Sequence, residues 1–160
     1  MGLATHLGSW LLGTVKNTTG TTLGTIRNMG ATSVGQMFPV TYTDAAGATA
    51  FVVPAGAIIT NIAFYSTTAF TGTTPTFKVT IAGTDVTTAN SFTSGTAFNG
   101  SLALAQTAGA AAVLANVGTI DAFVTYTIGG TGLSAGAGVL LVEYIVRNSD
   151  GTYVPTSQTA

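Results

Sequence analysis

Catalysis needs titratable or nucleophilic side chains that can converge, and this chain of 160 residues holds few of them. It has one histidine, no cysteine and five carboxylates, so neither a disulfide framework nor a thiolate metal site is available. The carboxylates do not cluster in the sequence; they are Asp44, Asp85, Asp121, Glu143 and Asp150. We therefore predict that the protein is not an enzyme and that it has no catalytic, cofactor-binding or metal-binding residues.

Two further features could carry chemistry, and both have a simpler interpretation. His6 lies beside Leu7 with no other metal-ligand type nearby, so a plain polar contact is a better interpretation than a ligand or a base. The sequence at 129–132, GGTG, lacks the lysine that a phosphate-binding loop requires. We interpret it as a turn that ends a strand.

Charge is scarce, at 6% of residues against about 25% in ordinary soluble domains. A surface so poor in charge tends to associate, which predicts a homo-oligomer. The expected oligomeric state is a trimer. The alternative is a monomer kept soluble by the hydroxyls and amides of Thr, Ser and Asn. The net charge of −1 gives no electrostatic footprint for nucleic acid and no polybasic patch for a membrane.

Neither a spanning helix nor a targeting segment is evident. No run reaches the roughly 18 to 20 apolar residues of a membrane helix. The first residues lack a basic region followed by an apolar one, as a signal peptide would have. We expect a protein made in a cytoplasm that reaches any extracellular destination by assembly.

Residues 1–36 differ from the rest and are expected to form an N-terminal arm. They are rich in Gly, Thr and Asn, and the sequence LGTVKN at 12–17 returns as LGTIRN at 23–28, a spacing of eleven. Each copy is interpreted as a short extended piece that carries one cation and ends in a turn. The arm either docks on a partner or forms a hairpin that covers a sheet edge. Its predicted partner-binding residues are Trp10, Leu12, Val15, Lys16, Leu23, Ile26 and Arg27.

The stretch 51–83 contains the clearest strands. A turn at 54–56 precedes a β-branched and aromatic segment with Ile62 and Phe64 on one face. After an expected break at 71–75, apolar residues at 77, 79 and 81 alternate with Lys78 and Thr80, which predicts that Lys78 faces water. Neither segment has a helical period.

The flanking segments are also interpreted mainly as strands. Residues 37–43 are expected to form an edge strand because Pro39 has no backbone donor. Phe92 and Phe98 are the expected anchors of a loop-rich span. The Ala-rich segment 101–114 favours a helix by propensity, but the sequence TAG at 107–109 interrupts it, so short strands around a turn are an equal alternative.

Two strands are expected near the C-terminus. Apolar and aromatic residues share one face of 122–128. Residues 139–146 are apolar on both faces except for Glu143, which is typical of a central strand or of one that faces a subunit interface. The predicted oligomer-interface residues are Leu140, Val142, Tyr144 and Val146.

Seven or eight short strands with frequent turns predict an all-β fold, a β-sandwich or jelly-roll-like domain. The expected organisation is an extended N-terminal arm at 1–36, a β-sandwich domain at 37–154 and a flexible tail at 155–160. We expect less than about a tenth of the chain to be helical, against the usual third.

The chain also resembles a known class of proteins, the small β-rich structural proteins of tailed bacteriophage virions. The resemblance covers about residues 37–147 and rests on short segments: PAGAIITNI at 54–62, TTAFTG at 67–72, TFKVTIAG at 76–83 and SAGAGV at 134–139 leading to Glu143 and Tyr144. It implies a component of the head or tail surface, commonly a jelly-roll-like domain and often a trimer. The Gly- and Thr-rich repeat at 1–36 departs from the usual pattern and leaves open whether the protein belongs to the head, the tail or a fibre.

Two functions follow from the resemblance. The first is a capsid decoration protein, which binds the major capsid protein or another virion protein and stabilises contacts between capsomers through many weak contacts repeated by symmetry. The alternative is a tail, fibre or surface adhesin module that binds host glycan. Glycan sites usually present aromatic and acidic side chains in loops, and the loops here offer mostly Thr, Ser, Ala and Gly, which favours the first.

Overall fold

The computed structural model describes residues 33–145, which form an all-β domain with one short helix. Two strands are much longer than the rest: β3 spans Ile58–Ile81 and β7 spans Ala122–Ile145, with 24 residues each. They pair antiparallel along almost their whole length. The remaining strands, which flank this pair, are β1 (Ser33–Thr41), β2 (Ala48–Val53), β4 (Thr84–Asp85), β5 (Asn90–Ser91) and β6 (Asn99–Ser101).

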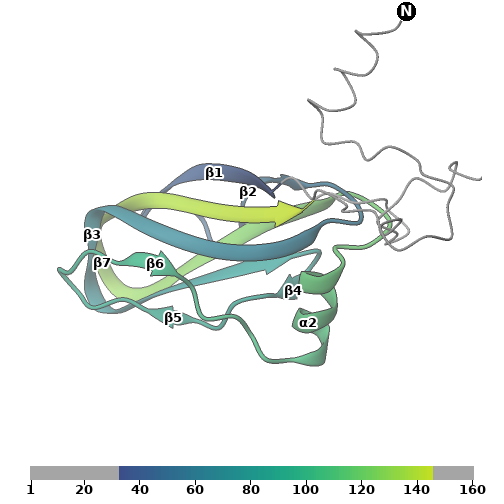
Figure 1. Cartoon of the computed structure of the whole chain (residues 1–160). Coiled ribbons are helices and arrows are strands. Elements are labelled where there is room, and N and C mark those ends of the chain that lie inside the picture. Colours follow the sequence, from purple (N-terminus) through teal and green to yellow (C-terminus); the bar gives the residue numbers. More distant parts are fainter. Residues whose placement is uncertain (1–32, 146–160) are drawn as a thin grey trace, which may run out of the picture.

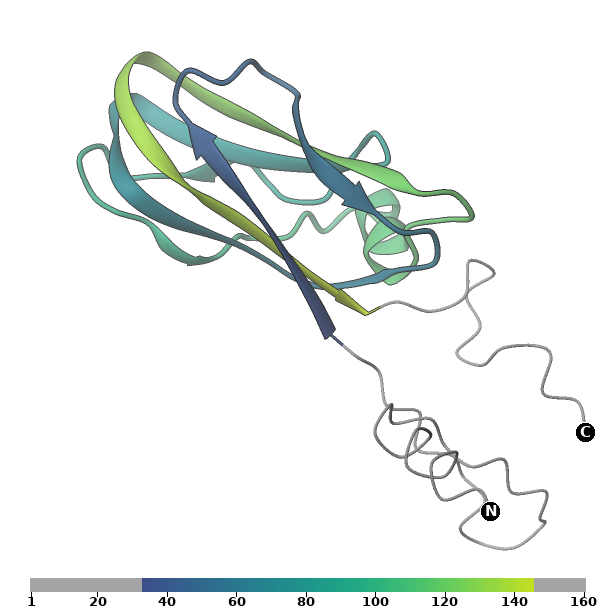
Figure 2. The same ribbon diagram turned by 90° about the horizontal axis from the view of Figure 1, so that it is seen from above.

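The long pair bends over on itself, so that one seven-stranded sheet makes both layers of a sandwich (Figure 1). In layer A, β1 pairs with the second half of β7, and the first half of β3 pairs with β6. In layer B, β2 pairs with the first half of β7, and the second half of β3 pairs with β4 and β5. β1 and β2 therefore follow different halves of the same strand (Figure 2).

The bend replaces two breaks that the sequence led us to expect, at 71–75 and at 129–132. Both segments lie inside continuous strands, and the register between β3 and β7 shifts repeatedly between Ser66 and Thr76. Each shift inserts unpaired residues that curve a strand without ending it. Gly130 and Gly132 have positive φ angles of 133° and 63°, which suits glycine and lets the backbone turn there.

Aromatic side chains fill the space between the two layers. Phe64 of layer A and Phe77 of layer B pack with ring centroids 4.7 Å apart and ring planes tilted by 40°, and both residues are fully buried. Phe92 lies 5.4 Å from the Phe64 ring and 4.7 Å from Phe98, so the expected anchoring of the loop-rich span by these two residues is confirmed. Glycine makes room for one ring: a Cβ at Gly138 would lie 2.4 Å from Cζ of Phe64.

The predicted alternation in the central strands is confirmed. Phe77, Val79 and Ile81 are completely buried, whereas Lys78 between them reaches solvent. The turn at 54–56 is also present, with Gly56 at φ 73° and Ala57 N–H donating to the carbonyl of Pro54 at 3.2 Å. β1 lies at the edge of the sheet as expected, but it begins at Ser33, so residues 33–36 belong to the domain and not to the arm.

The Ala-rich segment forms the helix α2, Ala108–Ala115, which packs beside β3 and β4 (Figure 1). We expected residues 107–109 to interrupt a helix, and instead they start one. Thr107 is the N-cap, and its hydroxyl accepts from the backbone N–H of Ala110 at 3.2 Å. The jelly-roll order of strands stays a prediction, as does the division at 155–160, which lies outside the described residues.

Candidate interaction surface

Each carboxylate in the described part of the chain has its own hydrogen-bond partners. Among residues 33–145, no three His, Cys, Asp or Glu side chains come close enough together to hold a metal ion. Asp121 accepts from the backbone N–H of Ala55 at 2.9 Å and so fixes the turn that follows β2. His6 and Asp150 lie outside the described residues.

Asp44 fixes the turn between β1 and β2. Its carboxylate accepts from the backbone N–H and the hydroxyl of Thr41, each at 2.8 Å, and from the hydroxyl of Tyr126 on β7 at 2.7 Å. Burial raises the pKa of Asp44, but these hydrogen bonds outweigh it and hold the pKa below its ordinary value of 3.8. Burial, with the bond to Asp44 next in importance, raises the pKa of Tyr126 well above its ordinary range, so its hydroxyl stays a donor.

Asp85 belongs to a polar group on the outer face of layer B. Lys78 Nζ lies 2.8 Å from one carboxylate oxygen, and the hydroxyl of Thr80 donates to the other at 2.8 Å. The hydrogen bond from Lys78 and then that from Thr80 lower the pKa of Asp85. The side chains are well exposed, so this pair contributes little to stability.

The predicted oligomer interface is wrong for the three residues that the structure describes. Leu140, Val142 and Tyr144 are at most 3% exposed, because they point into the protomer's own core between the layers. The hydroxyl of Tyr144 accepts from the side chain of Gln36, which also donates to the carbonyl of Val52 and so ties β1 to β2. One face of this strand lines the core and the other lies on the outside of layer A. Val146 lies outside the described residues.

The other face of the same strand carries the apolar surface that the sequence analysis did not single out. The pairing register places Met37 of β1, Leu141 of β7 and Ala63 of β3 in one cross-strand row. The neighbouring row contains Pro39, Val139 and Tyr65. Met37 is 71% exposed and Tyr65 is 45% exposed. Val139 and Leu141 are half-buried, and Ala63 is fully buried. We call the six residues of these two rows the apolar face: Met37, Pro39, Ala63, Tyr65, Val139 and Leu141.

One row beyond the apolar face, Glu143 lies between Gly35 of β1 and Asn61 of β3. Its carboxylate accepts from the amide of Asn61 at 3.2 Å. In the described part of the chain Glu143 has no ion-pair partner, since Lys78 and Asp85 make the single salt bridge there. Gly35 has no side chain, and a Cβ there would lie 3.4 Å from Cδ1 of Leu141 and 4.0 Å from Cγ of Glu143.

The free edge of β1 is half blocked. Tyr42, just beyond β1, donates its N–H to the carbonyl of Gly136 on β7 at 2.9 Å, so the even-numbered residues of β1 point their backbone groups at β7. The odd-numbered residues point theirs at the free edge. There Pro39 has no N–H, and the N–H of Thr41 is occupied by Asp44. The backbone groups of Ser33, Gly35 and Met37 remain available to another strand.

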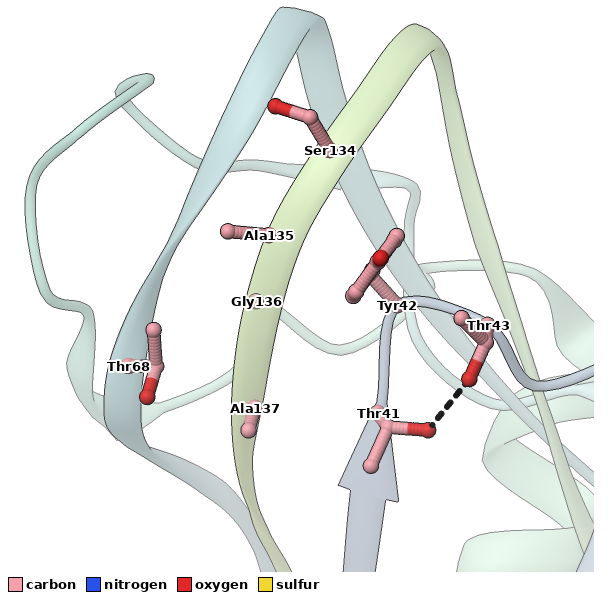
Figure 3. A pocket seen from close by; sticks show the side chains of 8 residues that line it. All are labelled: Thr41, Tyr42, Thr43, Thr68, Ser134, Ala135, Gly136 and Ala137. Atoms are coloured by element: carbon pink, nitrogen blue, oxygen red, sulfur yellow. Dashed lines mark hydrogen bonds between the residues drawn. The ribbon is translucent and has the colours of Figure 1, made fainter.

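A second surface feature is a shallow hollow of ≈ 350 Å³ near the bend, between the end of β1 and the curved parts of β3 and β7 (Figure 3). Most of its lining is apolar, but several lining residues carry hydroxyl groups. Those of Thr41 and Thr43 lie 3.0 Å apart, and that of Ser134 lies 2.9 Å from the hydroxyl of Thr71, which is outside the lining. The lining residues are Thr41, Tyr42, Thr43, Thr68, Ser134, Ala135, Gly136 and Ala137.

The seven predicted partner-binding residues of the arm all lie outside the described residues; they are Trp10, Leu12, Val15, Lys16, Leu23, Ile26 and Arg27. The apolar face could have been found from the sequence by giving Val139 and Leu141 the same weight as their neighbours at 140 and 142. Its members on the neighbouring strands, such as Met37, could not have been found in this way, because their positions depend on the pairing register between β1 and β7.

Comparison with known proteins adds no relative. No protein-family model matches the chain, and no curated protein is detectably similar to it. Within residues 33–145, no helix is both long and apolar enough to cross a membrane.

Proposed function

We propose that this protein is a structural component of a bacteriophage virion, a decoration protein that binds the head surface and stabilises contacts between capsomers. Its partners would be the major capsid protein, or another virion protein, and further copies of itself, with a trimer as the expected assembly. The observation that supports this most is the apolar face, on which Met37, Pro39 and Tyr65 are exposed. The resemblance of residues 37–147 to small phage structural proteins gives the class.

The apolar face suits repeated, shape-based attachment. Its side chains lie on three neighbouring strands held in register, so binding would need little reordering of the backbone. Large apolar residues such as Met37 and Tyr65 give contact area without requiring a charged partner. A single face of this kind binds weakly, and symmetry on a capsid multiplies many weak contacts. Trp10 and the repeat around Lys16 would add a second contact from the arm.

The test is binding to heads. Protein would be added to purified heads of the phage that encodes it, after the heads have been stripped of this protein, and bound copies would be counted after sedimentation. We expect saturable binding at symmetry-related sites, with little change between low and moderate salt because few charges take part. Met37→Lys in the apolar face should reduce binding at least about tenfold, the loss expected when an interface residue becomes an unpaired charge.

Thr49→Lys is the matched control, since Thr49 is exposed on β2, the edge strand of layer B. It adds the same charge to the opposite outer face and should leave binding unchanged. Absence of binding by the wild-type protein would refute the proposal. Equal loss in both variants would show that net charge, and not the apolar face, controls attachment.

The hollow at the bend supports a second candidate, an adhesin module that binds glycan. It combines the ring of Tyr42 with the hydroxyls of Thr41, Thr43, Thr68 and Ser134, groups that can stack on sugars and hydrogen-bond to them. Its lining contains no carboxylate or amide side chain, which makes it the weaker candidate. Binding to a glycan array that is lost in Tyr42→Ala would favour it over head binding.

A further inference from the structure

We propose that residues 23–28 of this chain pair, as an additional antiparallel strand, with the open part of the β1 edge at Ser33, Gly35 and Met37. In the pairing we infer, Leu23 lies opposite Met37, Thr25 opposite Gly35 and Arg27 opposite Ser33. The second copy of the repeat thus completes layer A and extends its apolar face. This inference concerns the protomer's own edge and holds whether or not the protein binds phage heads.

The first line of support is the backbone of β1. A sheet edge with unoccupied donors and acceptors is a template for another strand, and natural proteins block or cover such edges. Here the half near the bend is blocked by Pro39 and by the bond from Thr41 to Asp44. In the half that begins at Ser33, no proline and no side chain among the described residues blocks the backbone groups at the free edge. An occupant is therefore expected there, and it must end by Met37.

The second line of support is chain connectivity. Residue 32 leads directly into Ser33, the first residue of β1, so whatever precedes it starts at the open half of the edge. The five residues 28–32 would join the two strands, which is within the usual two to five residues of a hairpin loop. Gly30 lies in the middle of this connection and can adopt the positive φ that such loops require. A segment tethered this closely competes well against a foreign strand.

The third line of support is what the side chains would meet. Residues 33, 35 and 37 are all exposed and lie in the rows of the outer face of layer A. With the register above, Leu23, Thr25 and Arg27 share that outer face, because they alternate along the strand. Leu23 would cover Met37, which is 71% exposed.

Charge fits as well. Glu143 has no ion-pair partner among the described residues, and it lies beside Gly35 in the row next to the apolar face. In the proposed register Arg27 lies one row from Glu143 on the far side of β1, about 10 Å across the sheet, a span that the extended Arg and Glu side chains can bridge together. Arg27 is one of only four cationic residues in the whole chain, the others being Lys16, Lys78 and Arg147.

Cysteine cross-linking tests the register directly, because the wild-type chain contains no cysteine. Leu23→Cys with Met37→Cys would be oxidised at low protein concentration. Directly opposite residues have Cα atoms about 5.5 Å apart, within the range of a disulfide. We expect an intramolecular disulfide that forms at least about tenfold faster than in Gly24→Cys with Met37→Cys, whose side chains would point to opposite faces.

Two outcomes of the cross-linking experiment would overturn the proposal. Equal rates in the two double variants would show that no such register exists. A disulfide-linked dimer in place of the intramolecular product would show that the segment belongs to a second copy.

Amide hydrogen exchange on the full chain gives an independent test. Thr25→Pro removes a donor from the proposed strand, so the amides of Gly35 and Met37 should exchange at least about tenfold faster than in the wild type. Thr14→Pro makes the same change in the first copy of the repeat and should leave both amides protected. Fast exchange at Gly35 and Met37 in the wild-type protein would overturn the proposal even if the domain were otherwise well folded.

Discussion

The outer faces of the two layers differ although the same two strands build both. On layer A, the first half of β3 and the second half of β7 turn Tyr65, Val139 and Leu141 outward. On layer B, the other halves of these strands turn Lys78, Thr80 and Thr125 outward, and Asp85 joins them. The inner faces of both layers are equally apolar and buried.

Folding alone does not require this difference. A sandwich needs one apolar face per layer, and both layers already have it. The threonine-rich face of layer B is what a solvated face of an antiparallel sheet looks like. The apolar face of layer A is therefore an additional property of the sequence, and it is the basis of the proposed attachment.

Layer B has an apolar spot of its own, and Ile120, just before β7, is 77% exposed. Phe123 and its cross-strand partner Val52 are 62% and 39% exposed, and they lie at the end of the layer beside the turn at 54–56. This spot is one row wide, whereas the apolar face of layer A extends over two rows and three strands. The two spots offer a matched comparison of their contributions to association.

The largest expected effect on stability comes from the close packing of β7 against Phe64, next to the bend in the long strands. Gly138→Ala would place a Cβ 2.4 Å from Cζ of Phe64 and 2.6 Å from the carbonyl oxygen of Tyr65, so the core must shift. We expect a loss of about 3 kcal/mol in the free energy of unfolding, measured by urea denaturation.

Gly35→Ala is the control for this substitution. A Cβ there lies 3.4 Å from Leu141 on the outer face, an ordinary contact distance. Its stability should stay within about 0.5 kcal/mol of the wild type. Similar losses in both variants would mean that glycine matters for backbone freedom in β7 and β1 alike, and not for the space it leaves beside Phe64.

The next largest effect concerns the bond that joins the turn at the end of β1 to layer B. Tyr126→Phe removes the hydroxyl that donates to Asp44 and should cost about 1.5 kcal/mol, with Tyr42→Phe as a control that changes little. Since the folded-state pKa of Asp44 lies below 3.8, its hydrogen bonds stabilise the fold fully above that pH and less as pH falls through the folded-state pKa.

The pH dependence of unfolding checks this sign. The stability difference between the wild type and Asp44→Asn should be constant at neutral pH and should shrink in acid below the ordinary pKa of 3.8. A difference that grows in acid would contradict the assignment of Asp44 as a stabilising acceptor.

Self-association should depend on layer A more than on layer B. Tyr65→Ser shortens an exposed side chain in the apolar face and Phe123→Ser does the same on layer B, and both should leave the melting temperature nearly unchanged. We expect Tyr65→Ser to weaken association, measured by light scattering across a range of concentrations, and Phe123→Ser to have little effect. The opposite order would move the interaction surface to layer B.

The smallest expected effect is on the polar side. Asp85→Asn removes the salt bridge with Lys78, and because both side chains are well exposed the change in stability should be at most about 0.5 kcal/mol. The effect should also diminish as salt is raised. A larger loss, insensitive to salt, would indicate that the hydrogen bond from Thr80 matters more than the charge.

Much of the fold was predictable from local pattern. The alternation around Lys78 identified the inward residues of layer B, and Pro39 correctly indicated an edge strand. The bend was not predictable in this way, because the segments 71–75 and 129–132 have the composition of turns. They remain in strands because each is paired with the other, and that pairing links residues far apart in the sequence.

The predicted interface residues of β7 turned out to face the core, while the apolar face proposed for interaction lies on the other side of the same strand. Alternation shows that residues 140, 142 and 144 lie on one side and 139, 141 and 143 on the other, but it does not show which side is buried. In the structure the even-numbered side faces the core, where Gly138 leaves room for the ring of Phe64. That contact crosses between two strands and leaves no trace in either local sequence.

The direct pairing of Ser33 with Ile145 has a mechanical consequence. The described domain begins and ends at neighbouring positions of one sheet, so a tether on either flanking segment holds it at the same corner. A domain held at one corner can pivot, and a force that pulls both ends apart would peel β1 from β7 one bond at a time. A second attachment through the apolar face would prevent this rotation. A pulling force would then act parallel to β3 and β7, and the many hydrogen bonds between these two strands would resist it together.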